Sequence, residues 1–287
     1  MSGATLSLGT GCFPAERLGD CLECAARLGV AGLELAPGNA SRLAASGEEF
    51  RSALAAFERL GLERFSVHAW TGVEGLEAVC RFAERFGCGL IVVHSPPEKL
   101  DADFGGQARA LAAWDAWCRS KDIVLTVENS SMQRCAQFAE LFAAVPGLRL
   151  TLDVKHAYKP EKLGTTHRDF LERLAGRLAN FHISGVNRAR DELGDGCPPS
   201  DADNVDWRAF GRDLAARGYS GLVTAELIFP DHLSGAGIEA AYRDLGAPEP
   251  EFPTLMHRLA RSGVRYFREA LAPALAGPGS AEGRGGG

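Results

Sequence analysis

The stretch LEAVCRFAERFGCGLIVVHS, residues 76–95, decides the fold. Its first half repeats apolar residues at helical spacing, which predicts a helix with one apolar face: Leu76, Val79, Cys80, Ala83 and Phe86. Its second half, Leu90–Ser95, is a short apolar run rich in β-branched residues, which predicts a buried strand. A helix followed closely by such a strand is the repeating unit of an α/β protein.

The same alternation recurs along the whole chain. The candidate strands are Leu6–Cys12, Gly32–Ala36, Arg64–Trp70, Leu90–Ser95, Ile123–Asn129, Arg149–Val154, Asn180–Ser184 and Leu222–Ile228. They start about 25 to 45 residues apart, which is the spacing of a (β/α)₈ TIM barrel. The alternative, a doubly wound open sheet, ordinarily carries a glycine-rich phosphate loop, and Gly9-Thr10-Gly11 does not make that motif. We therefore predict one barrel domain over residues 1–276 and a disordered glycine-rich tail over 277–287.

Composition narrows the classes of function. Hydrophobic residues make up 46% of the 287 residues and charged residues 24%, which are ordinary values for a globular protein. A net charge of −6 argues against a nucleic acid partner. The apolar runs are too short to cross a bilayer, and the first residues do not resemble a secretory signal, so we expect a cytoplasmic protein without a membrane partner. Its eight cysteines are expected to be reduced and mostly buried.

Potential metal ligands follow most of the predicted strands. They are His68, His94, Glu128, Asp153, His156, His182 and Glu226. A lone residue of this kind is often a helix cap, an ion pair or a hydrogen-bonded core histidine. Seven of them at the barrel edge where such enzymes place their chemistry favour a divalent metal instead, since imidazole and carboxylate are the usual ligands of Zn²⁺, Mn²⁺ and Co²⁺.

Other features carry less information. Cys21 and Cys24 have the spacing of a metal or redox motif but lie in a predicted amphipathic helix, which favours a core role. Glu34 is either a carboxylate that supports a ligand or a plain ion-pair partner, and the sequence does not choose. Trp114 and Trp117 are expected to pack rather than to stack on a ligand. Two long polar stretches, 188–204 and 230–253, are expected to build an active site.

Taken together, these residues resemble the xylose isomerase-like TIM-barrel superfamily, also called AP endonuclease family 2. In its isomerase and epimerase branch, Glu128, Asp153, His182 and Glu226 match the ligands of one metal. The resemblance implies Glu128, Glu226 and His156 as catalytic residues, and Asn187, Arg188 and His156 as substrate-binding residues. One departure is that residues 130–134 lack the further glutamate that ketose epimerases carry.

The endonuclease IV-type phosphodiesterase branch is similar in other positions. It binds up to three metals and adds histidines on strands three and four, which match His68 and His94. It also has an Asp-x-His pair after strand seven, where this chain has Asp195 and Cys197, thirteen residues after His182. The resemblance implies a third metal held by His156, Asp195 and Cys197, with cysteine in place of the final histidine.

Three functions follow as expectations. The first is metal-dependent hydrolysis of a small organic phosphodiester, of the cobamide-remodelling type, because a multi-metal site uses His68 and His94 as extra ligands. The alternative is a sugar or sugar-phosphate isomerase or epimerase in which Glu128 and Glu226 move a proton. The third is a catalytically inactive binding module. All three imply a small-molecule ligand, the two enzyme functions imply one to three divalent metals, and the sequence leaves the oligomeric state open.

Overall fold

Eight parallel strands form the centre of the molecule. The structure, a computed structural model, describes residues 3–130, 134–158, 166–186, 196–228, 245 and 249–277. Its strands are β1 (Thr5–Gly9), β2 (Gly32–Leu35), β3 (Glu63–His68), β4 (Leu90–His94), β5 (Val124–Glu128), β6 (Arg149–Asp153), β7 (Leu178–Ile183) and β8 (Leu222–Ala225). They pair in chain order and close into a barrel through β8 and β1. The predicted (β/α)₈ barrel is confirmed.

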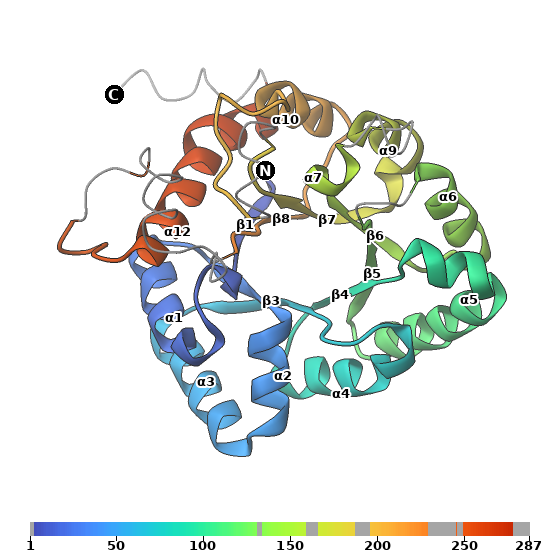
Figure 1. Ribbon diagram of the computed structural model, residues 1–287, viewed down its shortest axis with the longest axis horizontal. Helices are drawn as coiled ribbons and strands as arrows, with labels where there is room; N and C mark the ends of the chain where they lie inside the picture. Colours follow the sequence, from blue (N-terminus) through green and yellow to red (C-terminus); the bar gives the residue numbers. More distant parts are fainter. Residues whose placement is uncertain are drawn as a thin grey trace.

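Helices surround this ring, as Figure 1 shows. The main ones are α1 (Leu18–Arg27), α2 (Pro37–Ala45), α3 (Gly47–Leu60), α4 (Leu76–Phe86), α5 (Pro97–Arg119), α6 (Cys135–Ala144), α9 (His167–Leu174), α10 (Trp207–Ala216) and α12 (Leu255–Tyr266). Shorter ones are α7 (Val154–Ala157), η1 (Thr10–Cys12), η2 (Ala15–Arg17), η3 (Val73–Gly75), η4 (Ala175–Arg177), η7 (Phe267–Leu271) and α13 (Ala272–Leu275). In the described part of the chain, no helix is both long and apolar enough to cross a membrane.

The first and the last strand each end three residues earlier than the sequence predicts. The first ends at Gly9 because Thr10 turns into η1, where its hydroxyl accepts a hydrogen bond from the backbone amide of Ala36 and donates one to Asn39 Oδ1. The last ends at Ala225, although the Glu226 amide still donates to the Ile183 carbonyl at 3.1 Å. The predictions Leu6–Cys12 and Leu222–Ile228 were therefore too long at their carboxyl ends.

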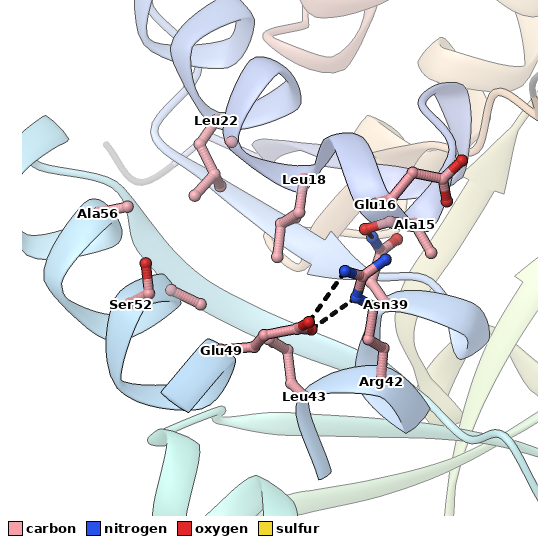
Figure 2. A pocket seen from close by; sticks show the side chains of 12 residues that line it. Ala15, Glu16, Leu18, Leu22, Asn39, Arg42, Leu43, Glu49, Ser52 and Ala56 are labelled. Atoms are coloured by element: carbon pink, nitrogen blue, oxygen red, sulfur yellow. Dashed lines mark hydrogen bonds and ion pairs between the residues drawn. The ribbon is translucent and has the colours of Figure 1, made fainter. Parts of the chain in front are cut away.

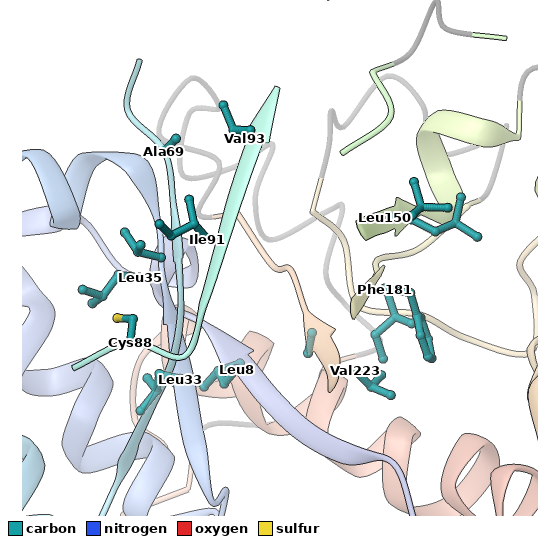
Figure 3. Close-up of a cluster of buried hydrophobic side chains, with 14 of the residues drawn as sticks. Leu8, Leu33, Leu35, Ala69, Cys88, Ile91, Val93, Leu150, Phe181 and Val223 are labelled. Atoms are coloured by element: carbon teal, nitrogen blue, oxygen red, sulfur yellow. The ribbon is translucent and has the colours of Figure 1, made fainter. Parts of the chain in front are cut away.

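Side chains along each strand alternate between the outer face of the barrel, which packs against the helices, and its interior. Successive side chains of a strand point to opposite faces, so every second residue faces the helices. These outward residues are apolar and form the main core; they include Leu33, Leu35, Ile91, Val93, Leu150, Phe181 and Val223, drawn in Figure 3. The residues between them face the barrel interior, and most of these inner residues are polar. The inner face therefore carries the chemistry and the outer face holds the fold together.

The helices complete the outer core. Cys21 and Cys24 are buried on α1, in agreement with the core role predicted for them. All eight cysteines lie in the described part of the chain and are buried, and none forms a disulfide there. On α5, Trp114 and Trp117 pack edge to face, with ring centroids 5.8 Å apart. The apolar positions of the opening stretch, Leu76–Phe86, form helix α4 as predicted, with its apolar face buried.

Candidate metal centre

The structure brings four predicted ligands together at the carboxyl ends of β5 to β8. Glu128 and Asp153 are the last residues of β5 and β6, His182 lies one residue before the end of β7, and Glu226 directly follows β8. One ligand atom from each lies within 4.8 Å of the others. Three of the four are buried, and the Glu226 side chain keeps 24% of its surface exposed. The group therefore opens to solvent on the Glu226 side.

The His182 imidazole lies in the middle of this group. Its Nδ1 atom is 2.7 Å from Glu128 Oε1 and 3.2 Å from Glu226 Oε2. Glu128 is the last residue of β5 and Glu226 directly follows β8, so the two carboxylates reach the His182 ring on β7 from two other strands. One imidazole nitrogen thus faces two carboxylates at once, which is the arrangement expected around a shared cation.

A second group of ligands shares Glu128. His68 Nε2 is 2.7 Å from Glu128 Oε2, and His94 Nε2 is 3.3 Å from the same oxygen. One ligand atom from each of these three residues lies within 4.8 Å of the other two. His68 is buried and His94 is 36% exposed, and Nδ1 of His68 has no hydrogen-bond partner among the described residues.

Asp153 is oriented by its surroundings. Its backbone is held by Asn129, whose side-chain amide exchanges two hydrogen bonds with the Asp153 amide and carbonyl, at 2.8 and 2.9 Å. Its Oδ1 caps α7 by accepting from the His156 amide at 2.8 Å. The His156 imidazole is farther away, with Nε2 3.7 Å from Asp153 Oδ2. His156 thus lies beside the centre but outside both groups.

Charge and burial shift the pKa values at the centre. Burial raises the pKa of the Glu128 carboxyl, but the positive charges of His182 and His68 outweigh it and hold this pKa well below its usual value. Burial lowers the pKa of His68, yet the adjacent Glu128 carboxylate raises it to about 9. Burial raises the pKa of Asp153 to about 6. The centre therefore combines crowded carboxylates with imidazoles that balance their charge.

A divalent cation fits these residues. Three carboxyl groups and one imidazole converge on one spot, where ionised carboxylates repel one another unless a cation lies between them. Oxygen and nitrogen donors of these types suit Zn²⁺, Mn²⁺ and Co²⁺. The charge of such an ion would replace the protons that the imidazoles supply to Glu128.

Glu34 is part of the same network, which decides the choice that the sequence left open. It lies on the inner face of β2 and is 2% exposed. Its Oε1 is 3.1 Å from His182 Nε2, on the side of the ring away from Glu128. Three polar residues around it were not predicted from the sequence, although each stands two residues before a predicted ligand: Ser66, Asn180 and Thr224. That period-two spacing was the signal that could have found them.

Of the predicted site residues not yet placed, the structure describes only Cys197. Cys197 is buried against Leu245 and Leu259, and it does not belong to either ligand group among the described residues. Asn187, Arg188 and Asp195 lie outside the described residues, as do residues 278–287 of the predicted tail. Their predicted roles stay predictions.

A separate cavity lies outside the barrel, between α1, α2 and α3. Its volume is about 210 Å³, and the Arg42–Glu49 ion pair crosses one side of it, with contacts of 2.6 and 2.9 Å (Figure 2). Its lining includes no residue of the two ligand groups. The clustered titratable groups at the barrel mouth, rather than this cavity, make the better candidate for chemistry.

Known proteins share this architecture. A model of the xylose isomerase-like TIM barrel matches residues 22–245. A xylose isomerase domain protein from Alicyclobacillus acidocaldarius has 16% identity and a TM-score of 0.69, and the match covers 94% of this chain and 99% of that one. The 3-keto-D-glucoside 4-epimerase from E. coli has 16% identity, a TM-score of 0.62, and coverage of 84% and 97%.

A D-tagatose 3-epimerase-like protein is also similar, with 14% identity, a TM-score of 0.60, and coverage of 84% of this chain and 100% of that one. At such identities the likeness to solved structures shows the fold alone. No curated protein matches the sequence significantly.

Proposed function

This chain belongs to the xylose isomerase-like TIM-barrel family, and from that premise we propose that it is a divalent-metal-dependent isomerase or epimerase of a sugar or sugar phosphate. The observation that carries the proposal is the convergence of Glu128, Asp153, His182 and Glu226 within 4.8 Å. Two similar solved structures, one named as an epimerase and one as epimerase-like, support this choice over hydrolysis. Hydrolysis was our first expectation from the sequence, and it becomes the second candidate.

The four converging residues would hold the metal, which we propose is Zn²⁺, Mn²⁺ or Co²⁺. When bound, such an ion polarises the carbonyl group of a sugar and makes the neighbouring C–H more acidic. The chain supplies the rest. Burial of Glu128, Asp153 and His182 fixes their positions, and the partly exposed Glu226 faces the side from which a substrate enters.

Glu128 and Glu226 are the proposed proton-transfer pair. They approach the same atom, His182 Nδ1, from the end of β5 and from the residue after β8. In the proposed epimerisation, one carboxylate removes the proton from the carbon next to the carbonyl, and the other carboxyl group returns a proton to the opposite face. No proton is gained or lost overall. His156, beside Asp153, and Asn187 with Arg188 are proposed to bind the substrate hydroxyl or phosphate groups.

Solvent exchange tests this function directly. The Co²⁺-loaded protein would be incubated with a panel of ketoses and ketose phosphates in D₂O, and products would be examined by NMR and mass spectrometry. We expect one deuterium at the carbon next to the carbonyl. Glu226→Gln is expected to slow the exchange by about 10²- to 10⁴-fold. Glu77→Gln, a change on the exposed face of α4, is the control and should keep full exchange.

A different outcome of these assays would contradict the isomerase proposal. A protein that leaves every sugar of the panel undeuterated while it cleaves a chromogenic phosphodiester is a hydrolase. This second candidate is favoured by one observation, the group of His68, His94 and Glu128, which shares Glu128 with the first group. A shared carboxylate between two ligand groups is typical of sites with two metals about 3.5 to 4 Å apart, which stabilise both oxygens in a displacement.

A further inference from the structure

Glu34 makes a contact that the proposed reaction does not use. Its carboxylate lies behind His182, with Oε1 3.1 Å from the Nε2 atom of the ring. The other ring nitrogen, Nδ1, faces Glu128 and Glu226. The imidazole is fully buried, so no solvent reaches Nε2. The two nitrogens of one buried ring therefore face two different sets of groups.

The far oxygen of Glu34 is held by two donors. Ser66 Oγ donates to Oε2 at 2.7 Å, and Asn180 Nδ2 donates to the same oxygen at 3.2 Å. The orientation of the Asn180 amide is set in turn by Thr224, whose hydroxyl donates to Asn180 Oδ1 at 3.1 Å. All of these side chains are buried in the barrel interior. The network leaves Oε1 as the acceptor that points at His182.

This geometry decides which nitrogen of the His182 ring keeps its proton when a cation displaces the other proton. A bare Nε2 would place its lone pair against a carboxylate oxygen, which is repulsive, whereas an Nε2–H donates to that oxygen. Asn180 Nδ2 also lies 3.2 Å from Nε2 and donates one of its two hydrogens to Glu34 Oε2. Its second hydrogen competes for Nε2 only as a neutral donor, whereas the bond from an Nε2–H to the Glu34 carboxylate is charge-assisted and stronger. In the metal-free protein Nδ1 also carries a proton, toward Glu128 Oε1 at 2.7 Å, and when a cation replaces that proton an Nε2–H leaves the Nδ1 lone pair for the cation.

We infer that Glu34 is a positioning residue that fixes His182 in the Nε2–H tautomer and so presents Nδ1 as the metal-ligating atom. The inference rests on the metal centre of the proposed function but not on the reaction carried out there. A residue that accepts a hydrogen bond from the other nitrogen of a metal-binding histidine supports metal binding. Removing such a residue typically lowers the metal affinity about 10- to 100-fold. Ser66, Asn180 and Thr224 act through Glu34 in the same way.

Glu34→Gln is the sharpest test. Ser66 and Asn180 are both donors, so they retain the carbonyl oxygen of the glutamine and turn its NH₂ group toward His182 Nε2. The NH₂ group then donates to Nε2 and favours the opposite tautomer, in which Nδ1 carries the proton. We expect the affinity for Co²⁺, measured by calorimetry, to fall about 10- to 100-fold. In Zn²⁺-treated protein labelled with ¹⁵N-histidine, the Nε2–H signature of His182 should be lost.

Asp115→Asn is the matched control. Asp115 is 2% exposed and pairs with Arg119 on the outer helix α5, so this variant also removes a buried carboxylate charge. It should keep the Co²⁺ affinity and the His182 signature. Ser66→Ala, which removes only the 2.7 Å donor to Glu34, provides a second variant if Glu34→Gln does not fold, and it should weaken Co²⁺ binding to a smaller but measurable degree.

The outcomes separate this inference from the proposed function. Unchanged Co²⁺ affinity and an unchanged His182 tautomer in Glu34→Gln, or in Ser66→Ala if it replaces that variant, overturn the inference and leave the metal enzyme intact. Weaker binding with the altered tautomer supports it, even if the protein turns out to hydrolyse a phosphodiester. A wild-type protein that binds no Co²⁺ overturns both.

Discussion

The Glu128 carboxylate connects the whole centre, because both of its oxygens are used and neither is exposed. His182 approaches Oε1, while His68 and His94 approach Oε2. A buried carboxylate stays ionised only where partners compensate for lost hydration. Without a metal, the imidazoles fulfil that role by carrying protons, and the stability of the metal-free protein should therefore depend on pH.

The pH dependence has a definite sign. The pKa of His68 is about 9 in the folded protein against 6.5 ordinarily, so the folded state holds its proton more tightly. Its stabilisation is complete below pH 6.5 and is lost as the pH rises through 9. We expect the free energy of unfolding in EDTA, measured with urea, to fall over this range, and to fall less steeply in His68→Gln. A wild-type profile that is flat between pH 6.5 and 9.5 would contradict this.

His94 distinguishes one metal from two. It touches Glu128 at 3.3 Å and is 36% exposed, so His94→Gln should fold. If the protein is an isomerase, the variant should keep the metal content and the deuterium exchange of the wild type. A fall in metal content together with a loss of phosphodiester cleavage by orders of magnitude would support the two-metal hydrolase instead.

Helix α4 shows how the outer elements keep the strands in place. Phe86 is 1% exposed, and its ring lies between those of Phe50, Phe57 and Phe82, with centroids 5.4, 5.6 and 5.3 Å away. These rings come from α3 and α4 and pack edge to face or stacked. Such aromatic packing contributes to stability beyond the burial of its area. This packing lies on the helix side of the strands, whereas the proposed metal ligands lie on the barrel side.

Removing this ring should therefore separate stability from function. Phe86→Ala leaves a cavity and should lower the free energy of unfolding by about 3–5 kcal/mol. The folded variant should bind Co²⁺ as tightly as the wild type does. Arg81→Ala, an exposed change on the same helix, should alter stability by no more than about 0.5 kcal/mol. A large loss of metal affinity in Phe86→Ala below its unfolding range would show that the two faces are coupled.

The barrel as a whole explains how much the sequence could predict. Each ligand stands at the end of an apolar run, and the closed parallel sheet collects those ends at one mouth. Knowing the fold class was therefore sufficient to predict that Glu128, Asp153, His182 and Glu226 meet, although they span 99 positions of the chain. The same logic placed His68 and His94 beside them.

The sequence could not predict in the same way which side chains contact one another at the mouth of the barrel. The His182 ring contacts Glu34, which is distant in sequence and which the sequence left open as either a support for a ligand or a plain ion-pair partner. The end of β1 depends on the Thr10 hydroxyl, which binds the Ala36 amide from another strand-end loop. Such contacts are set by the register of neighbouring strands, which a single sequence does not state.

Metal binding should stabilise the entire molecule, because the four ligands converge only in the folded barrel. At a Co²⁺ concentration a hundred times the dissociation constant, the free energy of unfolding should rise by about 2.7 kcal/mol. Urea unfolding with and without Co²⁺ measures the difference. Asp153→Asn should abolish most of it. An equal rise in that variant would mean that the ion binds elsewhere.

Elemental analysis of the protein after equilibration with Co²⁺ and desalting tests the existence of the centre most directly. Carboxylate and imidazole ligands in this number predict about one equivalent or more of Co²⁺ per chain in the wild type and in Asp115→Asn. Glu128→Ala combined with Asp153→Ala should reduce the content to a small fraction. A wild-type protein that retains less than about a tenth of an equivalent, where a site of this kind should hold its ion, would contradict the assignment of a metal centre.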